Sequence, residues 1–312
     1  MYQPSLLSSP LTLIHHHPGT SAQISLCLKR DDLLHPAIHG NKWRKLEPLI
    51  TELQKGAYTG ILTFGGPFSN HIHAVAAAGR LYGFSTAAIV RGQAADLSNP
   101  TLAFARSRGM QIFPVSKKDY DARTESAAVR GIKADFPGYF HLPEGGSTAA
   151  AAHNCMHISQ EIIRQINPEN GGLLFVAVPA GTGCTAAGVI AGLGDAGTVL
   201  VFPVAPYGVD EASIRERIAE ILPRPAPDFK VIADYCRDGF AAFWPEWIDF
   251  AAEFYLENVV LLDPVYTVKM MYGLFDLLTK GFFPPGSTVV AVHTGGLQGW
   301  EGYRQRYQQS GK

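Results

Sequence analysis

Lys42 lies at the start of a predicted helix, directly after Gly40 and Asn41 in the segment His-Gly-Asn-Lys-Trp-Arg-Lys-Leu. The partial positive charge at a helix N-terminus disfavours an ammonium group there. A positive potential also favours the uncharged amine, which is the form that attacks a carbonyl to make a Schiff base. Lys42 is therefore a candidate for covalent attachment of a carbonyl compound, and a solvated lysine is the simpler alternative.

A second chemical signal is the turn Gly181-Thr182-Gly183-Cys184-Thr185, which follows an apolar run and precedes a segment of small residues. Glycines let the backbone approach an anion, and amides and hydroxyls at a helix N-terminus can bind phosphate. No Gly-Lys-Ser/Thr follows, as a Walker loop requires, and Ala186 stands where a dinucleotide fingerprint has its third glycine. The turn therefore predicts a phosphate cup for a cofactor smaller than ATP or NAD.

Pyridoxal phosphate would satisfy both signals, because it carries one carbonyl and one phosphate. Three more glycine-rich or polar turns follow predicted strands, where ligands bind in open α/β sheets. Each of them alone is equally well explained by a tight connection. They comprise residues 65–71, 143–147 and 293–296.

Alternating apolar runs and helical patterns must position these turns. Strands are expected at 61–64, 86–90, 111–115, 173–178, 198–204 and 288–293. Helices are expected at 42–55, 70–82, 101–108, 147–166, 184–193, 211–221 and 265–279. This order is typical of βαβ units, so we expect an α/β protein with mostly parallel, twisted sheets in two lobes.

Composition excludes several other classes. With 46% apolar residues, 17% charged residues and a net charge of -1, the chain is globular and lacks a basic surface for nucleic acid. The nearly uncharged stretch 173–206 is interrupted by Pro179, glycines and Asp195, so no membrane span is expected. The four cysteines are far apart, which predicts a reducing, cytoplasmic location and no metal site.

The motifs taken together resemble a known family. The ordered set is Asn-Lys-x-Arg-Lys-Leu, Ser-Asn-His, Pro-x-Gly-Gly-Ser, Gly-Thr-Gly-x-Thr, Asp-Pro-Val-Tyr and His-Thr-Gly-Gly. This set is similar to that of the fold-type II pyridoxal phosphate enzymes, specifically the 1-aminocyclopropane-1-carboxylate deaminase and D-cysteine desulfhydrase family. The resemblance implies a tryptophan synthase β-like fold with the cofactor between a large domain (1–55 and 147–312) and a small one (56–146), and a homodimer.

The resemblance also implies roles for individual residues. Lys42 would bind the cofactor as a Schiff base, and Lys45, one helical turn on, would contact the phosphate. Ser69, with the amides of Asn70 and His71, would bind the substrate carboxylate. The remaining implied contacts are Asn70 with the cofactor 3-hydroxyl, residues 181–185 with its phosphate, Thr294 with its ring nitrogen, and Tyr266 as the tyrosine that flanks the cofactor and assists proton transfer.

Four positions depart from the family pattern. Thr267 follows Tyr266 where the ring-opening deaminase has a glutamate, and Phe240 replaces a second tyrosine. Trp43 replaces a smaller residue and Val268 a glycine. We therefore expect a lyase that removes the α-proton of a small, D-cysteine-like amino acid and releases a 2-oxoacid and ammonia by β-elimination. The ring-opening deaminase and a catalytically poor relative that retains the cofactor are the alternatives.

Overall fold

The computed structural model of the chain describes residues 8–166, 172–205, 209–222, 225–236 and 244–309. The chain forms two compact units, each made of several segments. Unit 1 comprises residues 1–35, 39–41 and 149–297, and unit 2 comprises residues 36–38, 42–148 and 298–312.

Unit 1 is built on a six-stranded sheet in the order β1, β2, β10, β7, β8, β9. β1 is antiparallel to β2, and all other neighbouring strands are parallel. Because β7 and β10 are parallel neighbours, the turns that follow them leave the same edge of the sheet. The strands are β1 (Leu11–Ile14), β2 (Ser25–Lys29), β7 (Leu174–Ala180), β8 (Thr198–Pro203), β9 (Phe229–Val231) and β10 (Thr288–Val292).

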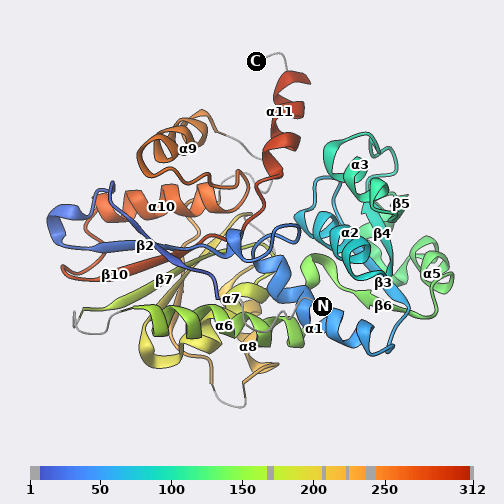
Figure 1. Cartoon of the computed structure of the whole chain (residues 1–312), viewed down its shortest axis with the longest axis horizontal. Helices are drawn as coiled ribbons and strands as arrows, with labels where there is room; N and C mark the ends of the chain where they lie inside the picture. Colours follow the sequence, from blue (N-terminus) through green and yellow to red (C-terminus); the bar gives the residue numbers. More distant parts are fainter. Residues whose placement is uncertain (1–7, 167–171, 206–208, 223–224, 237–243, 310–312) are drawn as a thin grey trace. The chain divides into compact units, whose positions relative to one another are not determined.

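Helices cover both faces of this sheet (Figure 1). One face carries α6 (Ala149–Gln165), α7 (Cys184–Leu193) and α8 (Glu211–Ala219), and the other carries α9 (Pro245–Asn258) and α10 (Thr267–Thr279). Short 3-10 turns are η2 (Thr20–Ala22), η3 (Asp31–Leu33) and η7 (Gly194–Ala196). The core between the sheet and α6 to α8 is aliphatic, with Ile158, Val176 and Ile190 fully buried.

The small residues of α7 have a packing role. A Cβ on Gly188 would lie 2.3 Å from the carbonyl oxygen of Ala152 in α6, and one on Gly192 would lie 2.5 Å from that of Met156. Only glycine permits so close an approach of two backbones. The small-residue pattern after the predicted phosphate cup therefore also brings α6 and α7 together.

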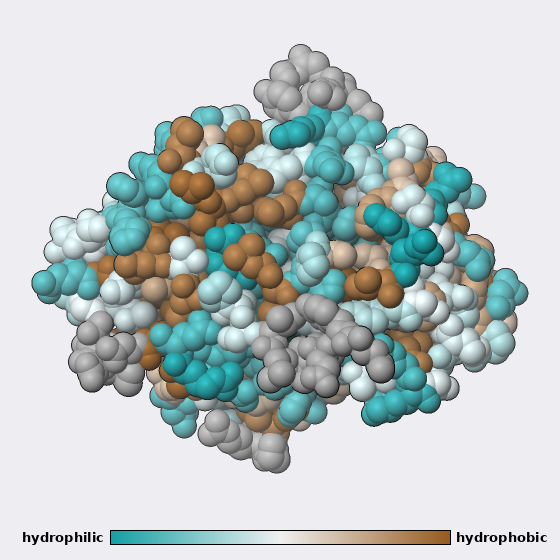
Figure 2. Space-filling model, in the orientation of Figure 1, coloured by the Kyte–Doolittle hydropathy of each residue, from teal (hydrophilic) through white to brown (hydrophobic). Residues whose placement is uncertain are grey.

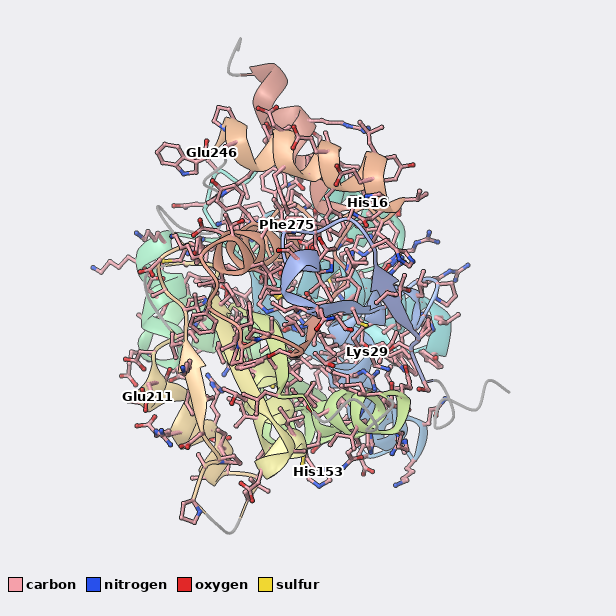
Figure 3. The ribbon with its side chains drawn as sticks, turned by 90° about the vertical axis from the view of Figure 1, so that its left-hand side faces the viewer. His16, Lys29, His153, Glu211, Glu246 and Phe275 are labelled. Atoms are coloured by element: carbon pink, nitrogen blue, oxygen red, sulfur yellow. The ribbon has the colours of Figure 1, made fainter. Side chains whose placement is uncertain are left out.

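Lys29 and Glu161 form a buried ion pair in unit 1, with 2.7 Å between Nζ and Oε2. Lys29 Nζ also donates to the carbonyl of Ser9, whose hydroxyl donates to Asp31 Oδ1 at 2.5 Å. Figure 3 shows Lys29 within the body of the molecule, on the β2 ribbon. Because a buried charge is stable only when it is paired, this network ties the segment before β1 to α6.

Unit 2 has a four-stranded, all-parallel sheet in the order β5, β4, β3, β6. The strands are β3 (Gly60–Gly65), β4 (Ser85–Arg91), β5 (Gln111–Val115) and β6 (Tyr139–Leu142). The helices are α1 (Asn41–Gln54), α2 (Asn70–Tyr82), α3 (Pro100–Ser107), α4 (Lys117–Ala122), α5 (Ala127–Ala134) and α11 (Gly299–Gln309), with 3-10 turns η4 (Arg123–Glu125) and η5 (Glu144–Gly146).

Side-chain alternation along β3 separates the two faces of this sheet. Leu62 and Phe64 pack in one cluster with Tyr120 of α4 and Val129 of α5. Thr63, between them in sequence, therefore points to the opposite face, on which α2 packs. This alternation directs a hydroxyl of the central strand toward α2.

The predicted fold class is confirmed, and each predicted helix and strand is present. The domain boundaries stay a prediction, and the observed units differ from them. Residues 42–55 group with unit 2, where Trp43 stacks on Tyr82 of α2 at 6.2 Å between ring centroids. Residues 298–312 also group with unit 2, because α11 contacts α3. None of the described helices is both long enough and apolar enough to cross a bilayer.

Candidate active site

The turn after β7 leads directly into α7. Gly183 precedes the helix with a φ of 79° and, as a glycine, has no side chain with which to cap it. A positive φ favours glycine, and a Cβ there would meet nothing closer than 3.5 Å, so conformation rather than space selects glycine. Cys184 and Thr185, the first two helical residues, are buried. The glycine turn and the helix that follows it are present as predicted, and the role of this turn as a phosphate cup stays a prediction.

Asn41, the residue before Lys42, is hydrogen-bonded to the start of α7 and to the turn after β10. Its Nδ2 donates to Thr185 Oγ1 at 2.9 Å, and its backbone amide donates to the carbonyl of Thr294 at 3.2 Å. Since Thr185 Oγ1 accepts this bond, its own hydroxyl proton can be donated to an anion. Asn41, Thr185 and Thr294 are all in unit 1, and Lys42 is the next residue of the chain.

Two glycines allow the backbone before Lys42 to approach the turn after β10. Gly40 has a φ of 61°, and a Cβ on it would lie 1.8 Å from the carbonyl oxygen of Thr294. A Cβ on Gly295, whose φ is 75°, would lie 3.0 Å from the amide nitrogen of Gly40. The backbones before Lys42 and after Thr294 therefore touch, and side chains at either glycine would separate them.

The turn that carries Thr294 is fixed by His293, a fully buried residue. Its Nδ1 accepts from the amide of Gly295 at 3.2 Å, and its Nε2 lies 2.9 Å from the carbonyl oxygen of Leu261. An imidazole that accepts at Nδ1 and donates at Nε2 is neutral. The 3.8 Å approach of Asp32 Oδ1 to Nδ1 is then not an ion pair.

In unit 2, α1 carries both candidate lysines. Lys45 is buried, and its Nζ donates to the carbonyl of Gly145 at 3.1 Å. The positive charges of Lys42 and Lys45 both disfavour protonation of His71 in α2, whose pKa is lowered. Trp43, between them, is buried against Tyr82 and belongs to the core of unit 2.

Ser69 is the N-cap of α2. Its Oγ accepts from the amides of His71 at 3.2 Å and Ile72 at 3.3 Å. The sequence assigned the His71 amide to a substrate carboxylate, and in the structure this amide serves the cap. The roles of Ser69, Asn70 and His71 in substrate binding stay predictions, and they require the Ser69 side chain to share or release this donor.

The His71 side chain is buried and makes one hydrogen bond within the described residues. Its Nε2 lies 2.8 Å from Thr63 Oγ1, which lies 3.0 Å from the carbonyl oxygen of Leu142. His71 Nδ1 is buried and has no partner among the residues that the structure describes. Burial, and then the charges of Lys42 and Lys45, lower the pKa of His71 well below its ordinary value.

Asn70 has a partner that the sequence did not indicate. Gln298 donates from Nε2 to Asn70 Oδ1 at 2.9 Å, and the two residues are 228 positions apart in the chain. Both belong to unit 2. No local pattern marks Gln298; only its place two residues after the paired glycines Gly295 and Gly296 could have drawn attention to it.

Tyr266 lies in a turn that Asp263 organises at the start of α10. Asp263 Oδ1 accepts from the amides of Val265 at 3.0 Å and Tyr266 at 2.9 Å, and Oδ2 accepts from the amide and hydroxyl of Thr267. The Thr267 hydroxyl is thus part of the helix start. Val268 is buried in the same turn. Phe240 lies outside the residues that the structure describes.

The residues present fit pyridoxal phosphate. Gly183 lets the backbone at the N-terminus of α7 approach an anion, and Thr185 can donate a hydroxyl proton to it. In unit 2 a lysine amine, a buried second lysine and the unpartnered Nδ1 of His71 offer groups suited to a carbonyl and to polar substituents. No cluster of three His, Cys, Asp or Glu suited to a metal occurs among the described residues.

These features define a pyridoxal phosphate enzyme of fold type II. A solved structure described as an ACC deaminase homologue shares the fold, with a TM-score of 0.81 over 97% of this chain and 93% of that one, at 24% identity. A pyridoxal 5'-phosphate-dependent aspartate racemase shares it with a TM-score of 0.66 over 93% of this chain and 90% of that one, at 16% identity.

The chain matches the family described as "Pyridoxal-phosphate dependent enzyme" over residues 8–295, and it belongs to that family. It is 31% identical to a D-cysteine desulfhydrase of Salmonella typhi over 86% of each chain. It is also 30% identical to a protein of Thermotoga maritima that is provisionally named a 1-aminocyclopropane-1-carboxylate deaminase, over 88% of this chain and 89% of that one. The protein is therefore a pyridoxal phosphate-dependent enzyme.

Proposed function

We propose that this enzyme is a lyase that converts a small amino acid with a β-leaving group, D-cysteine or a close relative, to a 2-oxoacid and ammonia. The name of the Salmonella relative supports the substrate class. One structural observation favours β-elimination over ring opening. Thr267, at the position of the deaminase's glutamate, is bound through its amide and its hydroxyl to Asp263.

The two reactions differ in whether they need an acidic group directly after Tyr266. Opening a cyclopropane ring breaks a carbon–carbon bond without an α-proton to remove, so it needs additional acid or nucleophile assistance. A threonine hydroxyl that donates to Asp263 Oδ2 at 2.7 Å supplies no carboxylate. Elimination from a substrate with an α-proton needs no such group.

The cofactor would be held by one covalent bond and by several polar contacts. Lys42 would bind its carbonyl carbon, the turn 181–185 with Lys45 would bind its phosphate, and Asn70 and Thr294 would contact its ring oxygen and nitrogen. The bound cofactor supplies an electron sink for the pair of electrons left at the substrate α-carbon. Thr294 offers a neutral hydroxyl to the ring nitrogen, which makes this sink weaker than a carboxylate would.

The chain's own groups would then move protons. Once its nitrogen is exchanged for that of the substrate, Lys42 Nζ takes the α-proton. Ser69 at the N-terminus of α2 binds the substrate carboxylate. The Tyr266 hydroxyl assists proton transfer to the departing sulfur. With D-cysteine and one water molecule the products balance as pyruvate, hydrogen sulfide and ammonia.

A substrate panel tests the proposal. The kcat/KM for D-cysteine, L-cysteine, D-serine and 1-aminocyclopropane-1-carboxylate should be measured on one preparation, with Lys42→Ala as the inactive control. We expect hydrogen sulfide and pyruvate from D-cysteine at the highest kcat/KM. Faster ammonia release from the cyclopropane acid would assign the ring-opening activity, and absence of turnover with every substrate would assign a non-catalytic relative.

We also propose a homodimer in the cytoplasm. Apolar side chains gather over α9 and α10 on the face shown in Figure 2. Around the end of α9, Leu256 is 78% exposed and Val259 76% exposed, and Val259 has the unfavourable φ of 55°. Such a surface is typical of an interface. Light scattering should give twice the 33.8 kDa chain mass, and a Leu256→Glu and Val259→Lys double variant should shift it toward the monomer.

A further inference from the structure

The side chains of Gln298 and Asn70 form an amide pair whose direction matters for the cofactor. Gln298 Nε2 donates to Asn70 Oδ1 at 2.9 Å. Each amide has one acceptor and two donors, so the bond fixes which end of Asn70 faces away from Gln298. With Oδ1 engaged, Asn70 presents the N–H groups of Nδ2.

The other end of the pair is also informative. Gln298 Oε1 is buried and has no hydrogen-bond partner among the described residues. Reversing both amides would join Gln298 Oε1 to Asn70 Nδ2, leave Gln298 Nε2 without that bond, and turn Asn70 Oδ1 outward. The two arrangements use the same number of hydrogen bonds within the pair, so the group that Asn70 faces decides between them.

The ring oxygen of the cofactor is ionised when the cofactor is bound to an amine, and an ionised oxygen is an acceptor. It attracts Nδ2 and repels Oδ1. We propose that Gln298 is a positioning residue, which donates to Asn70 Oδ1 and thereby presents Asn70 Nδ2 to the cofactor ring oxygen. This inference rests on the proposed contact between Asn70 and the cofactor.

The position of Gln298 gives the pair a second consequence. Gln298 follows Thr294 by four residues, and Thr294 is the proposed partner of the ring nitrogen. One short segment after β10 therefore carries the residue for the ring nitrogen and the residue that orients the contact to the ring oxygen. Both substituents that control the charge of the ring are served from residues 294–298.

Glutamate at position 298 tests the direction of the bond, because its carboxylate can only accept. Gln298→Glu would draw Nδ2 of Asn70 to itself and turn Oδ1 toward the cofactor. Gln298→Met removes both donor and acceptor at similar size. Asn70→Asp keeps the acceptor for Gln298 and removes the donor for the cofactor.

Two readouts are used, neither of which is turnover. They are the dissociation constant of pyridoxal phosphate and the pH midpoint at which the visible absorption of the bound cofactor titrates. A donor to the ring oxygen stabilises its ionised form and lowers this midpoint. We expect Gln298→Glu and Asn70→Asp to raise it and to weaken binding about three- to tenfold, the range of one hydrogen bond, with a smaller effect of Gln298→Met.

A double variant separates orientation from the added charge of the glutamate. In the Asn70→Ala background, Gln298→Glu should shift neither readout further, because there is no amide left to turn. A full shift in that background, or no shift from Gln298→Glu alone, would overturn the role of Gln298. If Asn70→Ala itself leaves both readouts unchanged, the proposed cofactor contact of Asn70 fails, and this inference fails with it.

A structural role would give a different pattern. In the cofactor-free protein, Gln298→Glu can still accept a hydrogen bond from Asn70 Nδ2, whereas Gln298→Met makes none, so a structural role predicts the larger fall in thermal midpoint for Gln298→Met. A loss of stability in these variants with unaltered cofactor affinity and unaltered absorption titration would make Gln298 a fold residue only, contrary to our inference.

Discussion

Thr63 fixes the tautomer of His71. Thr63 Oγ1 lies 3.0 Å from the carbonyl oxygen of Leu142, which can only accept, so the threonine proton is donated there. The 2.8 Å contact between Thr63 Oγ1 and His71 Nε2 must then use the proton of His71. Nδ1 is buried without a partner among the described residues, and burial lowers the pKa of His71, so the imidazole is neutral, with its proton on Nε2 and its lone pair on Nδ1.

This arrangement predicts an acid-sensitive fold. The unfolded chain binds a proton at His71 as the pH falls through about 6.5, whereas folded His71, with its lowered pKa, does not. The free energy of unfolding therefore falls as the pH drops below about 6.5, by up to about 1.4 kcal/mol per pH unit from this group, and is restored above it. Urea denaturation of the cofactor-free protein at several pH values measures this.

The matched variants are His71→Gln and His141→Gln. His141 is exposed on β6, and its pKa is also lowered, by desolvation and by the charge of Lys133. We expect the pH dependence to flatten much more in His71→Gln than in His141→Gln. Equal flattening in the two variants would show that folding lowers the pKa of His71 no more than that of His141, contrary to this prediction.

Lys42 and Lys45 predict different chemical outcomes. Lys42→Ala should abolish the covalent attachment of pyridoxal phosphate, and Lys45→Ala should weaken its binding while leaving the attachment intact. Mass spectrometry after borohydride reduction identifies the modified lysine. An adduct on Lys45, or on neither lysine, would contradict the assignment.

The prediction for the turn after β7 is that adding a methyl group at Gly183 weakens cofactor binding. Gly183→Ala forces a side chain into a positive φ, at a cost of about 1 kcal/mol. Gly286, with a φ of 78° and nothing within 4 Å of an added Cβ, is a control with the same backbone conformation. Both variants should lose similar stability, and only Gly183→Ala should lose cofactor affinity in equilibrium titration. Equal affinities would mean that the turn has no phosphate role.

Asp263 predicts a link between helix capping and the position of Tyr266. Asp263→Ala leaves the amides of Tyr266 and Thr267 without their acceptor, which should destabilise the protein by about 2 kcal/mol or more. We expect kcat to fall more than the dissociation constant of the cofactor rises. Asp263→Asn keeps one acceptor oxygen and should recover part of the lost stability and part of the lost kcat. If Asp263→Ala has the kcat of the unsubstituted enzyme, Tyr266 has no role in catalysis.

Several elements could be predicted from the sequence because their ends carry local signals. The helix predicted at 70–82 has the observed bounds of α2, since Ser69 caps it and Gly83 ends it with a φ of 77°. The bounds of α7 were also predicted, after Gly183 and before Gly194. Where the boundary residue has its own physical preference, the sequence alone locates it.

Other elements lacked such signals. β1 and β6 are four residues long and largely half-exposed, and β9 has three residues, so none forms a buried apolar run. The helix α9 begins at Pro245 and is rich in aromatic residues, which have only moderate helix propensity. The formation of α9 depends on packing, because Phe250 and Phe254 lie against Phe275 of α10. Phe275 is one of the residues labelled in Figure 3.

In the candidate site too, some residues carry local sequence signals and others do not. Motifs placed Lys42 at a predicted helix start and Ser69 and Thr294 at predicted turns, because a glycine or a helix cap beside each of them is visible in the local sequence. The contacts that orient these turns join residues distant in the chain, as Asn41 with Thr185 and Asn70 with Gln298 do. Such pairs depend on tertiary structure, and no periodicity in one sequence encodes them.

The strand order of unit 1 constrains when this protein can fold as it leaves the ribosome. β10 lies between β2 and β7, yet it comprises residues 288–292 of a 312-residue chain. The sheet of unit 2 is complete once residue 142 has been made. Until β10 emerges, the facing edges of β2 and β7 are unpaired and open to association with other nascent chains. We therefore expect stalled or truncated chains that end before residue 288 to need chaperones, even though their smaller sheet can already be formed.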